Sequence, residues 1–306
     1  MRRYDILVAG EINPDLILSG NVIPEFNQVE KIVDRAALTI GSSSAIFACG
    51  AARLGLRVAF IGVCGDDVFG RFMLDEMQKR DVDISHVIVR AQGQTGLSVI
   101  LNQGTNRAIL THPGLIPALQ ASDVTDALLC QARHLHVASY YLQTNLQPEM
   151  PGLFRRAHVL GLTTSLDTNY DPSEKWIRLE ELLPDTDVFL PNQTEALSIT
   201  HTSDVESATR QLAQKANLVT VKLGAQGALA CQGDTITRSN SISVHVVDTV
   251  GAGDTFDAGF IYGFLKQWPL ERSLQFACVC GALSTQTAGG TDGQPVLEEA
   301  MKHVSR

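Results

Sequence analysis

Four consecutive residues near the end of the chain combine a flexible backbone with an acidic side chain. Gly251, Ala252, Gly253 and Asp254 lie in the stretch DTVGAGDTFDAGF, where an apolar run begins. Glycine permits tight turns and a close approach of ligands to backbone N–H groups. The first N–H groups of a helix have no partner within it, and the helix dipole adds partial positive charge there. The stretch therefore predicts a helix start that binds an anion next to a carboxylate.

Phosphoryl transfer is the chemistry that suits such a site, because it needs mainly positioning and charge stabilisation. The amides of residues 251–253 would stabilise the negative charge of the transferred group, and Asp254 would take the proton of an attacking hydroxyl. The alternative is a glycine turn whose carboxylate only caps a helix. The stretch lacks the Lys-Ser/Thr ending of a Walker loop and the third glycine of a dinucleotide-binding loop.

Composition sets broad limits on the class of protein. The chain has 306 residues, of which 44% are hydrophobic, and a formal net charge of -9. This length suits one large α/β core. Without a long basic run, nucleic-acid or membrane binding is not expected, and no apolar stretch approaches the ~18 residues that span a bilayer. The six cysteines form no CxxC pair, so we expect reduced thiols in a cytoplasmic protein, without a zinc site.

Short apolar runs alternate with helical patterns from about residue 44 onward. Residues 58–65 predict a buried strand, and the apolar spacing within 66–80 predicts a helix. A second helix is predicted over 204–216, and further strand-like runs are HLHVAS, TTSLDTN, DVFLPN and LVTVKLG. Strands that alternate with helices predict a mostly parallel sheet that is covered on both faces.

Two stretches do not follow this alternation of strands and helices. Residues 15–40 and 93–112 alternate apolar and polar side chains with no helix between them, and the second resembles a hairpin with a turn near Gly104. A period of two predicts a sheet with one solvated face. Both stretches lie early in the chain, so they could pair into a small flap beside the main body.

Polar residues at strand ends are the natural place to look for a ligand site. Ligands of open parallel sheets bind at the carboxyl ends of the strands. The polar and glycine residues at such positions are Asn13, Asp15, Asp66, Asp167, Asn169, Asn192, Gly224 and Asp248.

The chain resembles the ribokinase-like (PfkB-type) carbohydrate kinase family. The resemblance rests on VVDTVGAGDTFDAGF and, in the expected order, on GEINPDLIL, GSSSAIFACGAARLG, GVCGDDVFG, LDTNY, PNQTEA and VKLGAQGALA. It implies a single domain over 1–306, a three-layer α/β/α fold with a mostly parallel sheet, and a small β-sheet lid formed by about 12–40 and 93–112. It also implies transfer of the γ-phosphate of ATP to a primary hydroxyl of a sugar, and is compatible with a homodimer through the lid.

The resemblance carries residue roles over by position. Asp254 would be the catalytic base, and Gly251, Ala252 and Gly253 would form the anion hole. The sugar would be bound by Asn13, Asp15, Gly41, Ser42 and Asn169. ATP would be bound by Asn192, Lys222, Gly224, Gly227, Thr249 and Gly253.

The resemblance also implies metal sites. Glu195 would help to hold Mg²⁺ through water, which is sufficient because magnesium keeps several waters and takes few carboxylates. Asp248 and the carbonyl of Val250 match a monovalent-cation site for K⁺, which a loop over 288–293 would complete.

The shorter motifs each have a purely structural alternative. The segment 13–15 could be a turn around Pro14, and Asn192 with Glu195 could be a helix capping box. Gly224 and Gly227 could form an ordinary β-turn, and Asp248 could be a buried structural carboxylate.

Departures from the family pattern bear on the substrate. Ile46 stands where many members carry an Asn that binds the sugar, and the serines at 42–44 could supply hydroxyls instead. Asp171 stands near the place of an Arg in many kinases of 2-keto-3-deoxygluconate, and an acid there would repel a substrate carboxylate. These departures favour a neutral sugar, with a nucleoside as the alternative. A non-catalytic sugar-binding protein is disfavoured by the GAGD stretch, and a dehydrogenase by the lack of an early dinucleotide loop.

Overall fold

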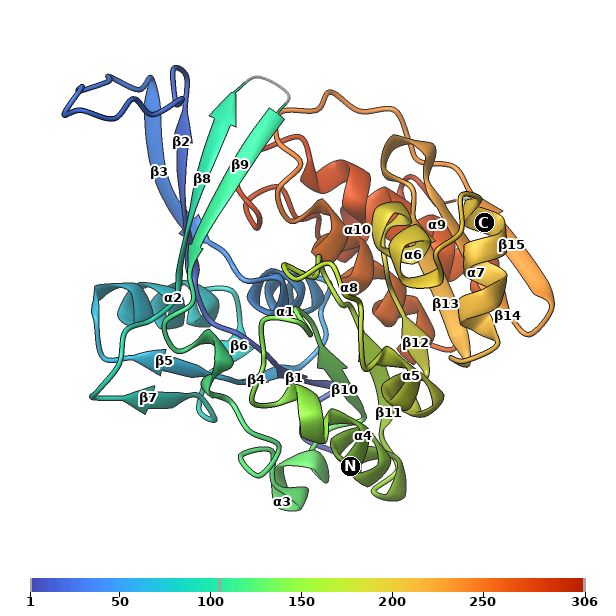
Figure 1. The fold of residues 1–306 in the computed structure, drawn as a ribbon. Coiled ribbons are helices and arrows are strands. Elements are labelled where there is room, and N and C mark those ends of the chain that lie inside the picture. Colours follow the sequence, from blue (N-terminus) through green and yellow to red (C-terminus); the bar gives the residue numbers. More distant parts are fainter. Residues whose placement is uncertain (1, 104–105, 305–306) are drawn as a thin grey trace.

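A nine-stranded sheet forms the centre of the molecule (Figure 1), in a computed structural model that describes residues 2–103 and 106–304. Within these residues the strand order is β15-β14-β13-β12-β11-β10-β1-β4-β6, parallel except where β14 joins β13 and β15 joins β14. The strands of this sheet are β1 (Ile6–Ala9), β4 (Val58–Ile61), β6 (Val82–Asp83), β10 (His134–Val137), β11 (Thr163–Leu166), β12 (Val188–Phe189), β13 (Leu218–Lys222), β14 (Ala228–Gln232) and β15 (Thr235–Ser239).

Helices cover both faces of this sheet, because its strands carry apolar side chains in both directions. In β1, Ile6 and Val8 belong to one apolar core, while Leu7 and Ala9 belong to the other. The first core contains residues of α1 (Ser43–Arg53), α2 (Val68–Gln78), α8 (Ala252–Leu265), α9 (Leu270–Ser284) and α10 (Leu297–Met301). The second contains residues of α3 (Asp126–Leu129), α4 (Met150–Val159), α5 (Leu179–Leu182), α6 (Gln193–Thr200) and α7 (Val205–Ala213). The predicted three-layer α/β/α fold is confirmed.

A separate four-stranded sheet stands away from the main body (Figure 1). Its order is β3-β2-β8-β9, with β2 (Pro14–Ser19), β3 (Arg35–Ile40), β8 (Leu97–Gln103) and β9 (Asn106–His112). Both alternating stretches of the sequence therefore contribute to one small sheet, and β8 pairs antiparallel with β9 as expected of a hairpin. The predicted turn near Gly104 lies outside the described residues. That this sheet acts as a lid on a single domain stays a prediction.

Short elements complete the described part of the chain. β5 (Val63–Gly65) pairs with β7 (Ile88–Arg90), and single 3-10 turns lie at η1 (Ile116–Ala118), η2 (Gln147–Glu149), η3 (Leu183–Asp185) and η4 (Gly224–Gln226). Among the described residues, no helix has the length and apolarity to cross a bilayer.

Two expectations differ from the structure. Residues 58–65 form two strands in different sheets, because the strand is interrupted at Gly62. A Cβ at this position would lie 2.4 Å from the Gly10 carbonyl oxygen. Cys130 is exposed, whereas the other five cysteines are buried as expected. The helix predicted over 66–80 is confirmed as α2, and the helix predicted over 204–216 as α7.

Gly227 gives a stability test of the turn that joins β13 to β14. Its φ is +92°, and a Cβ would lie 2.0 Å from the Ser239 carbonyl oxygen. We expect Gly227→Ala to lower the free energy of unfolding by about 2 kcal/mol or more, through strain and displacement of the backbone. The control is Gly152→Ala in α4, where a Cβ meets nothing within 4 Å and the free energy should be unchanged or higher by about 0.5–1 kcal/mol. Equal effects in urea denaturation would contradict this explanation.

Candidate active site

The start of α8 has the geometry that its glycines suggest. Gly251 is the N-cap residue at a φ of 71°, and no side chain caps this helix. A Cβ on Gly251 would lie 2.6 Å from the Gly290 carbonyl oxygen, so both the conformation and the space require glycine. The Ala252 amide makes only a long 3.4 Å hydrogen bond to the Thr249 carbonyl. The first turn of α8 is therefore suited to receive an anion from outside the chain.

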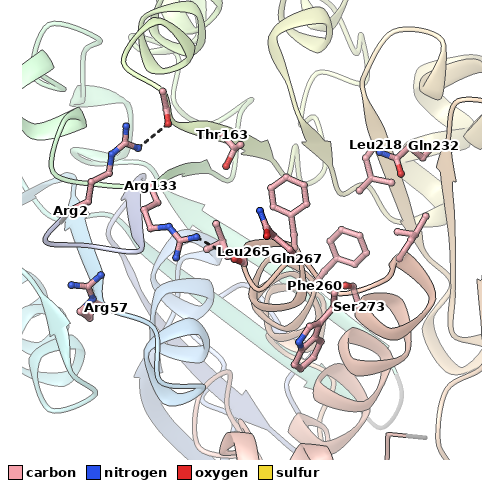
Figure 2. A pocket seen from close by; sticks show the side chains of 14 residues that line it. Arg2, Arg57, Arg133, Thr163, Leu218, Gln232, Phe260, Leu265, Gln267 and Ser273 are labelled. Carbon is pink, nitrogen blue, oxygen red and sulfur yellow. Dashed lines mark hydrogen bonds between the residues drawn. The ribbon is translucent and has the colours of Figure 1, made fainter. Parts of the chain in front are cut away.

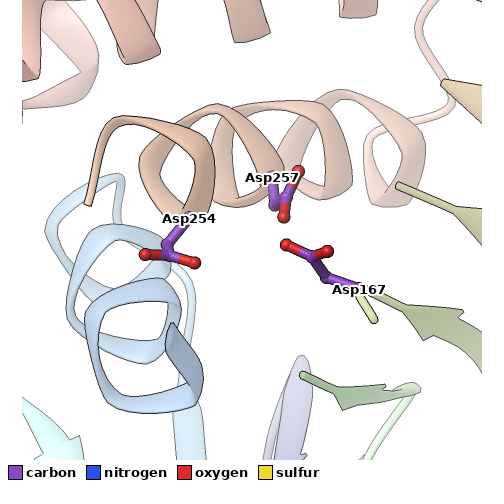
Figure 3. A group of neighbouring side chains, drawn as sticks. All are labelled: Asp167, Asp254 and Asp257. Carbon is purple, nitrogen blue, oxygen red and sulfur yellow. The ribbon is translucent and has the colours of Figure 1, made fainter. Parts of the chain in front are cut away.

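Three buried carboxylates gather beside this helix start (Figure 3). The carboxylate oxygens of Asp167, Asp254 and Asp257 lie within 4.8 Å of one another. Asp167 follows β11, while Asp254 and Asp257 are three residues apart on α8, so one face of the helix presents both acids. The Lys222 ammonium lies 2.8 Å from Asp167 Oδ2 and 3.0 Å from Asp257 Oδ2. One partly buried cation thus contacts two of the three buried acids.

This imbalance shifts the titration of the acids. Burial, and then the charge of Asp167, raise the pKa of Asp254 to about 7, against the opposing effect of Lys222. Burial raises the pKa of Asp257 well above its usual value. Burial would lower the pKa of Lys222, but the neighbouring carboxylates raise it. Asp254 is therefore a carboxyl group that changes charge near neutral pH, which suits a general base.

The predicted sugar-binding residues Asn13, Asp15 and Gly41 lie together where the small sheet joins the main body. Pro14 begins β2, so the segment is not a turn around that proline. Asp15 is 7% exposed, and Gly41 has no room for a Cβ, which would lie 2.2 Å from Asp15 Oδ1. Burial raises the pKa of Asp15 to about 7. The one side-chain hydrogen bond to this carboxylate among the described residues is a long 3.5 Å contact from Asn13 Nδ2.

Other predicted sugar-binding residues lie near the predicted base. Asn169 Nδ2 donates to Ser43 Oγ at 2.8 Å, and the Ser43 side chain is near enough to Asp254 to lower the pKa of that carboxyl group. Ser42 is the N-cap residue of α1, and its hydroxyl accepts from the Ala45 amide at 3.0 Å. The structure thus brings Ser42, Ser43 and Asn169 close to Asp254.

Asn192 and Glu195 form the capping box that was the structural alternative. Glu195 Oε2 accepts from the Asn192 amide at 2.9 Å, Oε1 accepts from Asn192 Nδ2 at 2.6 Å, and Asn192 Oδ1 accepts from the Glu195 amide at 3.0 Å. Burial, and then the charge of Asp167, raise the pKa of Glu195 to about 7. Both carboxylate oxygens are engaged locally, which leaves a water-mediated role for Mg²⁺ as a prediction.

The other predicted nucleotide-binding residues have different surroundings. The backbone of Lys222 forms an isolated β-bridge with Asn192, whereas its side-chain ammonium contacts the buried acids. Gly224 has a φ of +58° and open space where a Cβ would lie, whereas Gly227 is tightly packed. Thr249 is exposed next to the start of α8. Their role in binding ATP stays a prediction.

Asp248 joins two loops as the predicted cation site requires. Its Oδ1 accepts from the Val250 amide and its Oδ2 accepts from the Gly289 amide, both at 3.0 Å. These bonds also fit the structural alternative, a carboxylate that fixes loop backbone. Binding of K⁺ by Asp248 and Val250 stays a prediction.

Sequence reasoning did not select Glu11, Ser139 or Asp257, which the structure places in or beside this region. Glu11 is 2% exposed and lies between β1 and β2, where the strand-end rule could have selected it together with Asn13. Asp257 could have been found from its spacing of three residues from Asp254. Ser139 carried no signal, because a lone serine after a strand is common.

A cavity of about 890 Å³ lies at the other end of α8 (Figure 2). It lies at the amino ends of the strands, and none of the predicted site residues lines it. Its arginines are already engaged: Arg2 donates to three backbone carbonyls, and Arg57 forms a bidentate pair with Asp5. The cavity therefore does not compete with the Asp254 region as the reaction site.

Removal of the Asp254 charge should stabilise the protein at alkaline pH. A carboxyl group whose pKa rises on folding stabilises the fold at low pH, and this contribution is lost as pH rises through the folded-state pKa of about 7. We expect Asp254→Asn to raise the free energy of unfolding by on the order of 1–3 kcal/mol more at pH 8.5 than at pH 5. Urea denaturation at the two pH values checks this, and a lower free energy for the variant at pH 8.5 would contradict it.

Comparisons with known proteins identify the family of the chain. The model of the pfkB family carbohydrate kinases matches residues 5–297. A ribokinase of Haemophilus influenzae is 26% identical over 99% of both chains, and a 2-dehydro-3-deoxygluconokinase of Bacillus subtilis is 32% identical over 84% of both chains. The crystal structure of a probable sugar kinase protein from Rhizobium etli has a TM-score of 0.85 at 25% identity, covering 99% of this chain and 98% of its own. The chain belongs to the pfkB family of carbohydrate kinases and is a phosphotransferase with a sugar acceptor.

Proposed function

We propose that this sugar kinase transfers the γ-phosphate of ATP to a primary hydroxyl of a neutral sugar, with Asp254 as the base. The observation that carries the proposal is the buried Asp254, with a pKa of about 7, in the first turn of a helix that no side chain caps. Base and anion site are adjacent because they belong to the same helical turn.

The chemical step follows from this arrangement. Asp254 takes the proton of the sugar hydroxyl, and the oxygen attacks the γ-phosphorus. The bond from this phosphorus to the β–γ bridging oxygen breaks, and ADP leaves with the electron pair. The amides of Gly251, Ala252 and Gly253 stabilise the charge on the transferred group. Lys222 is held beside them, since a Cβ on Gly253 would lie 3.6 Å from its Nζ.

Metal ions would assist through residues at the edge of this site. Glu195 and Asn192 fit a water-mediated Mg²⁺ ion, because their direct acceptors are engaged with each other. The ion would neutralise phosphate charge when ATP is bound. Asp248 and Val250, with the loop at Gly289, fit a K⁺ site that would fix the backbone around the start of α8.

Asp15 supports a sugar with free hydroxyl groups as the substrate. A buried carboxylate with one long hydrogen bond needs donors, and two hydroxyls of a polyol would supply them. A substrate carboxylate would be repelled at the same place. Asp171 adds nothing to this argument, because its carboxylate accepts from the amides of Ser173, Lys175 and Trp176 in its own loop.

The small sheet would act as a lid and as a dimer contact. Apolar side chains of β9 and of the connection between β2 and β3 are open to solvent: Leu110 is 62% exposed, Phe26 is 87% exposed and Ile32 is 79% exposed. Packing against a second copy would cover them.

A substrate panel tests the activity. We expect ADP release with ATP, Mg²⁺ and a neutral pentose or hexose, and not with nucleosides or 2-dehydro-3-deoxygluconate. Asp254→Asn should lower kcat by about 10²–10⁴-fold, because the proton acceptor is lost. The control Asp204→Asn changes an exposed N-cap carboxylate on α7 and should leave kcat unchanged. Turnover of a nucleoside or a keto acid instead of a neutral sugar would contradict the proposed substrate class. An Asp254→Asn variant that stays active would contradict the role of Asp254 as the base.

The pH dependence gives a second test. Only the deprotonated Asp254 can accept the proton, so kcat should rise with pH through about 7 and level off above it. The measurement is kcat from pH 5.5 to 9 with saturating ATP and sugar. A kcat that falls over this range would contradict the role of Asp254.

Asp15→Asn tests the sugar site separately from the chemistry. Loss of a charged acceptor should raise the KM for the sugar by about 10–100-fold, because each hydrogen bond to a charged group contributes about 1.5–3 kcal/mol. The KM for ATP should change less than about threefold. Equal changes in both KM values would place Asp15 outside the sugar site.

A further inference from the structure

Glu11 is a buried carboxylate at the centre of a group of serines. It is 2% exposed and follows β1. Its Oε1 accepts from Ser139 Oγ at 2.9 Å, Ser42 Oγ at 3.1 Å and the Ser44 amide at 3.2 Å. Its Oε2 accepts from Ser44 Oγ at 2.6 Å. An ionised carboxylate only accepts hydrogen bonds, so it can hold all of these donors at once.

The residues around Glu11 have unusual backbone conformations. Ser42, Ser139 and Asn169 have φ values of 64°, 50° and 52°, in the region that favours glycine. Each such residue costs on the order of 1–3 kcal/mol and persists only where its surroundings fix it. Glu11 contacts the first two directly, and the Ser139 amide donates to Asn169 Oδ1 at 2.9 Å. The carboxylate therefore holds three strained turns together, where β10, β11 and α1 meet.

This group connects to the proposed base in one further step. The Oδ1 of Asn169 is fixed by Ser139, and its Nδ2 donates to Ser43 Oγ at 2.8 Å. Ser43 in turn is near enough to Asp254 to lower the pKa of that carboxyl group, and in the sequence it lies between the two serines that contact Glu11. Movement of Glu11 would therefore displace Ser43 from both sides.

We propose that Glu11 is a positioning residue for phosphoryl transfer, which holds Ser43 and Asn169 in place so that they orient the Asp254 carboxylate. The inference rests on the proposed role of Asp254 as the base. Within the described residues Glu11 makes no direct hydrogen bond to Asp254, so it acts through the serines and through its charge.

Glu11 also belongs to the set of charges that control Asp254. The charged groups that face Asp254 are Asp167 after β11, Lys222 at the end of β13, Asp257 on the same helix and Glu11 after β1. Both Asp167 and Glu11 raise the pKa of Asp254, and Lys222 lowers it. Removal of the Glu11 charge alone should thus lower the pKa of Asp254.

Glu11→Gln removes the negative charge at residue 11 and keeps nearly the same side-chain shape. The Gln oxygen can keep the bonds that Oε1 accepts, and the Gln amide can donate to Ser44 Oγ, so the fold should survive. We expect the titration midpoint of the Asp254 carboxyl carbon to fall by about 0.5 pH units or more. The midpoint is followed by ¹³C NMR, and the signal is assigned with Asp254→Asn. The acidic limb of the plot of kcat against pH should shift in the same direction. The value of kcat should fall by about tenfold, and the KM for ATP should stay within about threefold of the wild-type value.

Glu11→Ala and a matched control complete the experiment. Glu11→Ala removes every bond that the Glu11 side chain makes with the serines, leaves the 2.7 Å bond from Ser42 Oγ to the backbone carbonyl of residue 11, and should lower kcat by about 100-fold. The control is Asp187→Asn, a carboxylate before β12 that accepts from the Thr164 amide at 2.8 Å and from His158 Nε2 at 2.9 Å. It should change stability but neither the Asp254 midpoint nor the acid limb of kcat.

The two proposals fail in different ways. An unchanged Asp254 midpoint and an unchanged kcat in Glu11→Gln would overturn the role of Glu11, even if the wild type is an active kinase. A shift of the midpoint equal to that in Asp187→Asn would also overturn it. If the wild type released no ADP with any sugar, the proposed function would fail, while the NMR titration would still decide whether Glu11 controls Asp254.

Discussion

The burial of several carboxylates around one ammonium is the constraint on which the site depends. Asp167, Asp254 and Asp257 are within reach of one another, and the Lys222 ammonium contacts two of them. Excess buried negative charge is unfavourable, and it is relieved when a carboxyl group keeps its proton near neutral pH. The same imbalance raises the pKa of Asp254 to about 7, which supports its proposed role as the base. The apolar side chains buried in the large cores on both faces of the sheet offset this unfavourable free energy.

The topology explains why these groups meet. Parallel strands bring their carboxyl ends to one edge, so residues that follow β1, β10, β11 and β13 become neighbours. The start of α8 lies beside the acids at the same edge (Figure 3), and the first amides of a helix carry partial positive charge. The small sheet adds Asn13 and Asp15 from one side. A sugar hydroxyl, a base and an anion site can therefore share one small volume without any long loop.

Several residues serve the fold and the proposed chemistry together. Asn192 and Glu195 cap α6, and Glu195 is also close enough to Asp167 for the charges to interact. Gly251 gives α8 its left-handed N-cap and leaves its first amides without a side-chain acceptor. Ser42 caps α1 and contacts Glu11. A structural explanation of such motifs is thus compatible with a functional one, and the presence of a cap alone does not decide between them.

The sequence by itself determined the fold class, the helix start at 251–254 and the family, because periodicity and local motifs depend on neighbours along the chain. The two sheets followed from the change of period between the early stretches and the rest. Only the tertiary structure decided that Lys222 contacts two acids, that Asp257 joins Asp254 and Asp167, and that Glu11 gathers three serines. Glu11 and Ser139 are 128 residues apart, and no local pattern encodes their contact. Such pairs arise from strand order and register, which are properties of the folded sheet.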